Sequence, residues 1–549
     1  MVVARQPLSS PTGEPSPTAA PTPLPSATPS PLRLAAQAGM PQQAVALALS
    51  TLGHLPTGAI LAEDDPDLLL SWQAMPGDPL IYERILVPVS RFSTLLSGIS
   101  SQELRSVWLG VGAASGFRVI YPAEEVVADV EALLGPHGPD VQPQPSAAIV
   151  DVLWADPQGI GIVPFEALEP RLRSLALDGL SATDNRLAQA GWPLARRAWL
   201  HPVTARGAEA LAQAEGWKPI TNRDPGRLTV LVMTGVTAMA RGTAAAIEAA
   251  GDYAFPARLI GPELAAADLT VISNEVPFVE GCVPDNTLNN LILCSKPEYF
   301  AALELSGVDA VGLTGNHQND FGYDKMLASL AFYAEKGIPV YGGGANDEAA
   351  RAPLILEHHG NRLAFLGANQ FGPEVYSTAS GEQVSAWAGE QTPGSARFDR
   401  GQMSAAIQAI KPQVDLVLAE VQHTEFNPAG DYQVEPLPEQ MADFRALHEA
   451  GAAVVTGVQA HTPQAIELYS DSIILYGLGN LYFDQTWSWP TRTGLVARHI
   501  IYEGRLLGTE LLVTVIEMNK QLRWATPEER QEVLQTVFAA SHWAWMGAQ

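Results

Sequence analysis

Residues 308–322 concentrate polar side chains of the types that do chemistry. Residues 308–313 are apolar or small, as in a short buried strand, and Gly315 and Gly322 bound the turn that follows. Amide, imidazole and carboxylate groups in such a turn can coordinate metals or bind phosphate-like oxygens. Asn and Asp are also common turn formers, and a lone histidine is often a surface residue, so this loop alone leaves both interpretations open. The polar residues are Thr314, Asn316, His317, Gln318, Asn319 and Asp320.

The elements around this loop are a strand before it and a helix predicted over residues 323–336. In α/β proteins, side chains at the carboxyl end of a strand project into the crevice outside the sheet. A merely solvated loop would use Lys, Ser and Glu freely, so we expect Asn, His and Glu beside glycine to converge on one site. Five more predicted strands end in polar groups, at residues 228–233, 269–273, 416–420, 453–457 and 473–477.

Four sequence motifs follow one another in this region: N-E at 274–275, G-N-H-x-x-D-x-G at 315–322, G-x-x-A-H at 457–461 and Y-G-L-G-N-x-x-F-D at 476–484. Together they resemble the CapA family of bacterial capsule and poly-γ-glutamate synthesis proteins, over about residues 228–500. The resemblance implies an α/β sandwich related to the calcineurin-like metallophosphatases. In those relatives, Asn and His of the G-N-H loop serve the metal and the phosphate.

Residue by residue, the resemblance implies a divalent metal ion (Mn, Fe, Zn or Mg). Glu275, His317 and His461 would ligate it, and Asn316 would position the substrate oxygen, so that Asn316 and His317 are the catalytic candidates of the loop.

The other candidate residues of the resemblance act on substrate. His423 or Glu425 would be the general acid or base. Arg241, Asn274 and Asn480 would bind substrate oxygens.

The chain departs from the CapA pattern where a bridging carboxylate is expected. CapA-like sequences often read G-D-x-x-x-x-R, and here Gly235 is followed by Val236, with Arg241 in register. Of a G-H-x-H motif only His461 is retained, and the histidine of H-W-G-x-E is displaced to His423. A two-metal centre holds its ions about 3.5–4 Å apart through shared ligands. The site would therefore hold a single ion or bind an anionic polymer without cleaving it.

Two functions follow from these motifs, and whether the chain is an enzyme stays open between them. The first is an extracytoplasmic protein of capsule or poly-γ-glutamate type surface-polymer synthesis with metal-dependent hydrolase or transferase chemistry. The second is a non-catalytic polymer- or anion-binding protein on a degenerate metallophosphatase fold.

The charge balance of the chain argues against some classes of binding partner. The 59 acidic and 32 basic side chains give a formal charge of −27, which argues against a basic footprint for nucleic acid. We therefore expect an anionic polymer or a phosphate-containing small molecule as ligand, and no nucleic acid.

Two features indicate an extracytoplasmic location. Residues 11–31 are rich in Pro, Ser, Thr and Ala, so residues 1–34 are predicted to be a disordered tether, of the kind that holds a domain away from a membrane. The signal or anchor would lie upstream of the given chain, although an ordinary disordered tail is an alternative. Cys282 and Cys294 bracket a short loop, which fits one disulfide, with two unrelated buried thiols as the alternative.

Residues 35–225 alternate short apolar runs with helical patterns, which predicts a smaller α/β domain. The segments V-P-V-S, G-I-G-I-V-P and W-P-L loosely resemble periplasmic substrate-binding proteins of the phosphate-binding type, and an unrelated α/β spacer is the alternative. The CapA-like sandwich would span residues 226–520, and residues 521–549 would be a helical tail. Strands of the smaller domain are predicted at 85–89, 119–120, 148–154, 159–164 and 197–201, and a capping box at residues 100–103 opens a helix.

Overall fold

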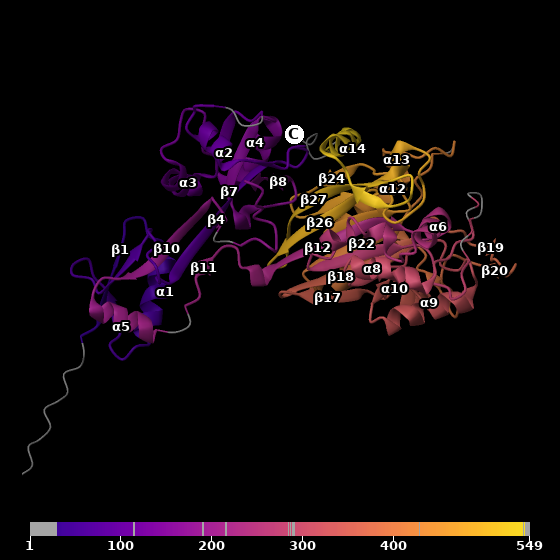
Figure 1. The fold of residues 1–549 in the computed structure, drawn as a ribbon, viewed down its shortest axis with the longest axis horizontal. Coiled ribbons are helices and arrows are strands. Elements are labelled where there is room, and N and C mark those ends of the chain that lie inside the picture. The colour runs from indigo at the N-terminus through magenta and orange to yellow at the C-terminus, as the bar shows by residue number, and fades with distance from the viewer. Residues whose placement is uncertain are drawn as a thin grey trace, which may run out of the picture. The chain divides into compact units, whose positions relative to one another are not determined.

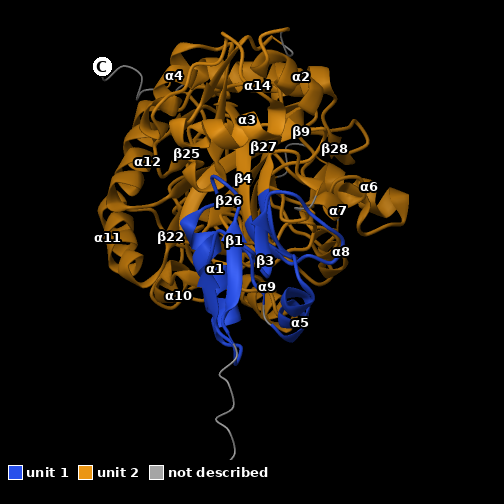
Figure 2. Cartoon of the chain, turned by 90° about the vertical axis from the view of Figure 1, so that its left-hand side faces the viewer, with its two compact units in different colours: residues 1–82, 197–220 blue, residues 83–196, 221–549 orange. Residues whose placement is uncertain are grey.

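The computed structural model describes residues 30–541 and 543, apart from positions 113–115, 189–190, 215–216, 284, 286, 288–290 and 428. The chain divides into two compact units, one of residues 1–82 and 197–220 and one of residues 83–196 and 221–549 (Figure 2). The predicted tether lies outside the described residues up to position 29, and its last residues enter strand β1. Among the described residues we find no helix with the length and hydropathy of a membrane span.

The smaller unit is an α/β structure. Strand β1 pairs in parallel with β2 and β3, and β10 pairs antiparallel with β3. Its core forms where Leu34, Leu68 and Leu200 of the strands pack with Ala44 and Leu52 of α1. The elements are β1 (Leu32–Ala36), α1 (Gln42–Gly53), β2 (Ala59–Leu61), β3 (Leu68–Ser71), β10 (Ala195–Pro202) and α5 (Ala205–Gln213).

Residues 83–196 open the larger unit, and most of their predicted elements are confirmed. Strand β4 pairs antiparallel with β7, which pairs in parallel with β6. Helix α2 begins with the predicted capping box, because Ser100 and Glu103 each accept from the other's backbone N–H. The elements are β4 (Leu80–Arg91), β5 (Gly98–Ile99), α2 (Ser101–Trp108), β6 (Val119–Pro122), α3 (Val127–Leu134), α4 (Ile149–Ala155), β7 (Gly159–Pro164), β8 (Leu172–Ser174) and β9 (Ala176–Leu177).

The strand predicted at residues 148–154 is wrong, because this segment forms helix α4. Its buried residues are Ile149, Val150, Leu153 and Trp154, and Asp151 is exposed. Burial at positions i, i+1, i+4 and i+5 is the pattern of a helix face, whereas a run of apolar residues this short is ambiguous without it.

The first sheet of the C-terminal sandwich has the order β15-β14-β13-β12-β26-β27-β28. The strands from β12 to β15 are parallel, and β26, β27 and β28 add an antiparallel half (Figure 1). The strands and their helices are β12 (Leu228–Thr237), α6 (Arg241–Ala250), α7 (Gly261–Leu264), β13 (Leu269–Asn274), α8 (Phe300–Leu305), β14 (Ala310–Gly312), α9 (Tyr323–Glu335), β15 (Val340–Tyr341), α13 (Trp489–Arg492), β26 (Thr493–Tyr502), β27 (Arg505–Ile516), β28 (Leu522–Trp524) and α14 (Pro527–Ala540).

The second sheet has the order β17-β18-β22-β23-β25-β24 and is parallel from β18 to β25. Its elements are β17 (Leu354–His358), β18 (Asn361–Asn369), α11 (Arg400–Ile410), β22 (Leu416–Gln422), α12 (Pro438–Ala450), β23 (Val454–Val458), β24 (Ile466–Leu468) and β25 (Ile473–Leu475). Two short elements, β16 (Gly343–Gly344) and α10 (Asp347–Arg351), precede β17 in the chain. Three more, β19 (Tyr376–Ser377), β20 (Gln383–Val384) and β21 (Gly394–Ser395), lie between β18 and α11 in the chain.

Successive side chains of a strand point to opposite faces of its sheet, so each strand contributes to two packing layers. In β12, Leu231 and Met233 belong to a cluster shared with Phe365 and Leu418 of the second sheet, whereas Val232 belongs to the cluster of α6, α8 and α9. On the second sheet, Val417 and Ala419 pack with α11 and α12. Each sheet therefore has helices on one face and the other sheet on its opposite face, which confirms the predicted α/β sandwich.

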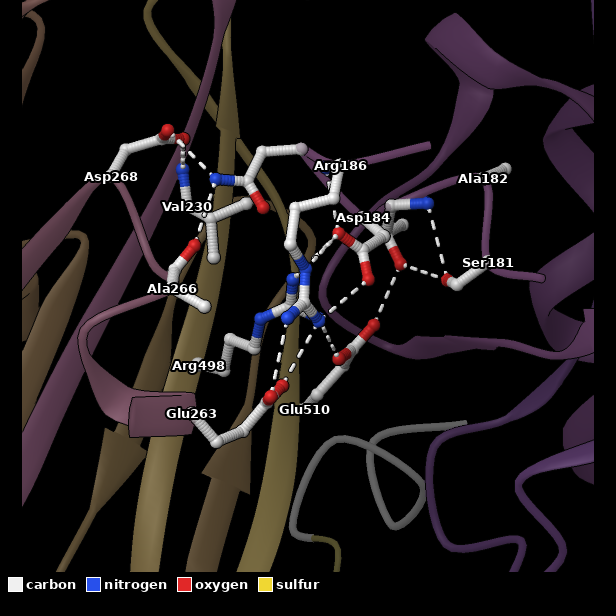
Figure 3. A network of polar contacts seen from close by, with 12 residues as sticks. Ser181, Ala182, Asp184, Arg186, Val230, Glu263, Ala266, Asp268, Arg498 and Glu510 are labelled. Atoms are coloured by element: carbon white, nitrogen blue, oxygen red, sulfur yellow. Dashed lines mark hydrogen bonds and ion pairs between the residues drawn. The ribbon is translucent and has the colours of Figure 1, made fainter. Parts of the chain in front are cut away.

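The compact units differ from the predicted domains, because residues 83–196 share a core with the sandwich. Phe92 packs edge-on against Phe538 of α14, and Phe165 does so against Tyr502. A polar network adds to this contact: Arg186 pairs with Glu263 at 3.0 Å (Figure 3). In addition, Thr183 donates to Glu510 at 2.6 Å. The predicted helical tail includes α14 but also β28, which belongs to the first sheet.

Candidate functional site

Two strand ends of the first sheet meet at the start of the site. Asn274 ends β13 and is followed by Glu275, and the G-N-H loop follows β14. A Cβ at Gly315 would lie 2.2 Å from Cα of Glu275. Only glycine therefore lets the loop that carries His317 lie directly against the backbone of Glu275.

His317 is held by Asp320, three residues further along the same loop. The His317 Nδ1 lies 2.7 Å from Asp320 Oδ2, and the backbone N–H of Leu293 donates to that same oxygen at 2.6 Å. Burial alone would lower the pKa of His317, but the charge and hydrogen bond of Asp320, together with the charge of Glu275, raise this pKa to about 9. At neutral pH, His317 is therefore a cation whose Nδ1–H is bound to a carboxylate.

Two buried carboxyl groups share this region. Burial raises the pKa of Glu275 to about 7, against the charges of His317 and Arg241. Burial also raises the pKa of Glu425 well above its ordinary value, and the charge of Glu275 adds to this effect. Glu425 accepts from the backbone N–H of His461 at 2.5 Å through Oε2, and its Oε1 has no hydrogen-bond partner among the described residues. Both groups can hold a proton near neutral pH.

His461 is neutral, in contrast to His317. Burial lowers the pKa of His461 to about 4, although its hydrogen bond to Asn480 opposes this effect. Its Nδ1 lies 2.8 Å from Asn480 Oδ1, while the Asn480 Nδ2 donates to the backbone oxygens of His461 and Thr491. Because that Oδ1 can only accept, Nδ1 of His461 carries the hydrogen and Nε2 keeps a lone pair.

Arg241 forms a buried ion pair at the start of α6. Its Nη2 lies 2.6 Å from Asp484 Oδ1, and the backbone N–H of Gly242 donates to the other oxygen of Asp484 at 3.0 Å. The guanidinium also lies 5.1 Å above the centre of the Phe483 ring. Arg241 has φ of 43°, a left-handed backbone that a long side chain rarely adopts.

The amide side chains link the two sheets. Gln422 at the end of β22 donates to Asn316 Oδ1 at 2.9 Å and also contacts Gln459. Asn369 donates to Gln422 Oε1 at 2.7 Å. Asn316, predicted to position a substrate oxygen, is thus itself fixed by an amide from the second sheet.

Two predicted site residues point elsewhere. His423 Nε2 lies 2.9 Å from Asp443 Oδ2 on α12, and its ring packs edge-on with Phe444. Asn274 donates to the backbone of Val276 and to the hydroxyl of Tyr333, each at 2.8 Å. Their side chains bind neighbouring structure, and their assignment to catalysis and substrate binding stays a prediction.

The structure brings the charged candidates together, since the charges of Arg241, Glu275 and His317 act on the pKa values of their neighbours. The groups affected are Glu275, His317, Glu425 and His461. Sequence reasoning assigned no role to Asp320 or Asp484, which hold the two cations. The spacing His-x-x-Asp in the loop was the available signal for Asp320. The partner of Arg241 could not be read from spacing, because the two residues are 243 positions apart.

The resemblance implies a divalent metal, which would need several His, Cys, Asp or Glu side chains close together. In the described part of the chain, no three His, Cys, Asp or Glu side chains stand in an arrangement that could hold a metal ion. Asp320 and Asn480 bind the Nδ1 atoms of His317 and His461, which leaves the Nε2 atoms as the ring positions that a metal could use. The described donor set does not fit a metal as it stands, and the ligand role of Glu275, His317 and His461 stays a prediction.

A pocket of about 260 Å³ opens beside this cluster. Arg241 and Asp285 contribute its charged edge, and Leu293, Cys294 and Phe321 contribute apolar walls. Cys294 is bonded to Cys282, so the predicted disulfide is present in the structure.

Comparisons with known proteins agree with the motifs. The family described as bacterial capsule synthesis protein PGA_cap matches residues 230–485. The capsule biosynthesis protein CapA of Bacillus anthracis is 27% identical over 317 residues, which are 56% of this chain and 71% of that protein. The PGA biosynthesis protein CapA of Bacillus subtilis is 25% identical over 213 residues, 39% of this chain and 52% of that protein. The chain thus spans about half the length of this second relative.

A solved structure of a putative 5′-nucleotidase from Staphylococcus aureus also matches, over 56% of this chain and 58% of its own, with 12% identity and a TM-score of 0.28.

Proposed function

Residues 230–485 belong to the PGA_cap family of bacterial capsule synthesis proteins, and we propose that this chain takes part in capsule or poly-γ-glutamate type polymer synthesis through acid–base chemistry at its candidate site. The observation that carries the proposal is the bound pair His317–Asp320 beside two buried carboxyl groups. Environments that push the pKa values of neighbouring groups apart are typical of acid and base assignments.

In this proposal His317 is the acid. Its cationic ring, fixed through Nδ1 by Asp320, offers the Nε2–H to a negatively charged or leaving oxygen of the substrate. After proton transfer the neutral ring stays oriented by the same hydrogen bond.

Glu275 is the base, because a pKa of about 7 suits a group that gains and loses a proton near neutral pH. Glu425, whose pKa is raised well above its ordinary value by burial, donates a hydrogen bond to a substrate oxygen from the Oε1 that lacks a partner among the described residues.

The substrate in this proposal is an anionic polymer or a phosphate-containing precursor. The pocket beside Arg241 and the cationic His317 support an anionic group in an otherwise acidic protein. The Cys282–Cys294 disulfide supports an extracytoplasmic location, because such bonds persist in oxidising compartments.

A second candidate function is polymer binding without cleavage. Val236 supports it, since this apolar, buried side chain stands where the family pattern has a carboxylate. The amide network of Asn316 and Gln422 could then bind carbonyl or carboxylate oxygens directly.

The test compares wild type with His317→Gln on poly-γ-glutamate and on aryl phosphate esters. Cleavage and polymer binding are measured separately, by product release and by calorimetry, with His54→Gln on the exposed end of α1 as the control. Cleavage by wild type and the control, with at least a 100-fold loss in His317→Gln, supports the acid–base role. Polymer binding without cleavage supports the second function, and neither binding nor cleavage by wild type contradicts both.

A further inference from the structure

Two arginines of the larger unit, Arg173 and Arg530, have side-chain nitrogens without partners. Arg173 lies on β8 and Arg530 in the first turn of α14, and neither element contributes a residue to the candidate site. The Nε of Arg173 and the Nη2 of Arg530 are buried, and no hydrogen-bond partner for them lies in the described part of the chain. Neither side chain forms an ion pair with a described residue. Buried donors without partners are rare in native proteins, and in a chain with 59 acidic side chains these two need an explanation.

The two guanidinium groups lie near each other beside the end of β4. Arg173 stands directly opposite Ser90 in the antiparallel pair of β4 and β8. The Nη1 of Arg530 donates to the backbone oxygen of Leu95, just after β4, at 2.6 Å. Burial lowers the pKa of Arg173 to about 10, and the like charge of Arg530 adds to this effect. The two cations are therefore close enough to repel each other.

Glu510 is the carboxylate whose charge acts on Arg173, and both of its oxygens are already bound. Its Oε1 accepts from the hydroxyl of Thr183 at 2.6 Å, and its Oε2 accepts from Nη1 of Arg498 at 2.8 Å. The negative charge of Glu510 is thus shared with Arg498 and does not balance the two unpaired arginines. An excess of positive charge with free N–H donors therefore remains at Arg173 and Arg530.

We propose that Arg173 and Arg530 form a binding site for a doubly charged oxyanion, namely a phosphate group. A guanidinium presents N–H donors in a fork that matches two phosphate oxygens, and two guanidinium groups match the charge of a dianion. A carboxylate carries one charge and would leave one of the two cations unbalanced. The hydroxyl of Ser90, whose contact with the backbone oxygen of Arg91 is long at 3.4 Å, lies on the same face as Arg173 and adds a neutral donor.

Arg91 provides a matched control on the same pair of strands. It stands opposite Leu172, one position away from the Ser90–Arg173 pair, so its side chain lies on the other face of the sheet. Its Nε is also buried without a partner among the described residues, and burial alone lowers its pKa. Arg91→Gln therefore removes a comparable cation without removing a donor of the proposed phosphate site.

The experiment measures binding of inorganic phosphate to the full chain by isothermal titration calorimetry at low ionic strength. Wild type is compared with Arg173→Gln, Arg530→Gln and the control Arg91→Gln. His317→Gln is included because the candidate site has cations of its own, and phosphate bound there would respond to that variant instead. Glycerol phosphate and glutarate are titrated in parallel, to compare a phosphate ester and a dicarboxylate with the free ion. Thermal unfolding of each variant without phosphate monitors folding.

We expect a phosphate site that Arg173→Gln and Arg530→Gln each weaken at least ten-fold. Arg91→Gln and His317→Gln should change its affinity less than two-fold. Without phosphate, Arg173→Gln should unfold at the wild-type temperature or above it, because one of two like charges is gone.

Three results would overturn the proposal. The first is a wild type that binds no phosphate, or binding that Arg173→Gln leaves unchanged. The second is glutarate binding more tightly than inorganic phosphate and glycerol phosphate, which would exclude phosphate as the preferred ligand. The third is a lower unfolding temperature of Arg173→Gln together with lost binding, because Arg173 would then serve the fold and not a ligand. No turnover is measured, so this test is independent of the proposed function.

Discussion

The guanidinium of Arg241 lies 2.6 Å from the carboxylate of Asp484, although the two residues are 243 positions apart in the chain. This ion pair links the loop after β12 to the last motif of the C-terminal sandwich. Both side chains are buried, at 5% and 1% exposure. Its burial makes this pair far more consequential for folding than a surface ion pair of the same length.

We expect Asp484→Asn to lower the free energy of unfolding by on the order of 3 kcal/mol, because it removes one charge of a buried pair. The control is Glu304→Gln, which breaks the exposed pair with Lys336 at 2.8 Å and should cost about 0.5 kcal/mol or less. Urea unfolding of both variants checks the difference. Equal losses would contradict the role given to burial.

Gly315→Ala should destabilise the protein by about 2 kcal/mol or more, since the added Cβ would lie 2.2 Å from Cα of Glu275. Gly53→Ala at the end of α1 is its control, because no atom lies within 4 Å of the added Cβ. Thermal unfolding measures both. A Gly315→Ala protein as stable as the control would mean that the two loops do not touch.

Stability should fall as pH rises from 6.5 to 9. The pKa of His317 is raised from 6.5 to about 9, so the folded state binds this proton more tightly than the unfolded chain does. Its contribution is fully present below pH 6.5 and is lost by about pH 9, a change of up to about 3 kcal/mol. His317→Gln should flatten this part of the pH–stability curve, and His54→Gln should not. A wild-type curve that rises across this range would contradict the assignment.

Glu425→Gln should leave stability unchanged at pH 4 and raise it at pH 8. Burial raises the pKa of Glu425, so its contribution to stability is present at low pH and is lost as pH rises, whereas glutamine needs no proton. Glutamine also keeps an oxygen that can accept from the N–H of His461. Denaturant unfolding at the two pH values checks this, and a loss of stability at pH 8 would contradict it.

The sequence predicted the sandwich well because its buried strands are short apolar runs that end in motifs of fixed order. Residues 228–233 and 269–273, for example, are confirmed as parts of β12 and β13. It failed at residues 148–154, where a short apolar run fits either a strand or a helix. It also could not show that residues 83–196 pack with the sandwich, because contacts such as Phe92 with Phe538 depend on tertiary structure.

Within the site, short sequence motifs indicated which strand ends carry polar residues. They did not show which side chains from distant parts of the chain contact one another. The G-N-H loop and Glu275 follow neighbouring parallel strands, and the charges of His317 and Glu275 act on each other's pKa, whereas the roles of these residues stay predictions. The orientation of His423 toward Asp443 could not be read from the sequence, because the ring follows β22 by one residue and that single position decides which face it occupies.

The pKa of His317 tests the account most directly. It is measured by nuclear magnetic resonance titration of the His317 imidazole in wild type and in Asp320→Asn. The account predicts a pKa of about 9 in wild type, and a lower value in the variant, in which the carboxylate charge is gone. A wild-type pKa at or below 6.5, or one that Asp320→Asn leaves unchanged, would contradict the central claim that Asp320 holds His317 as the cationic acid of the site.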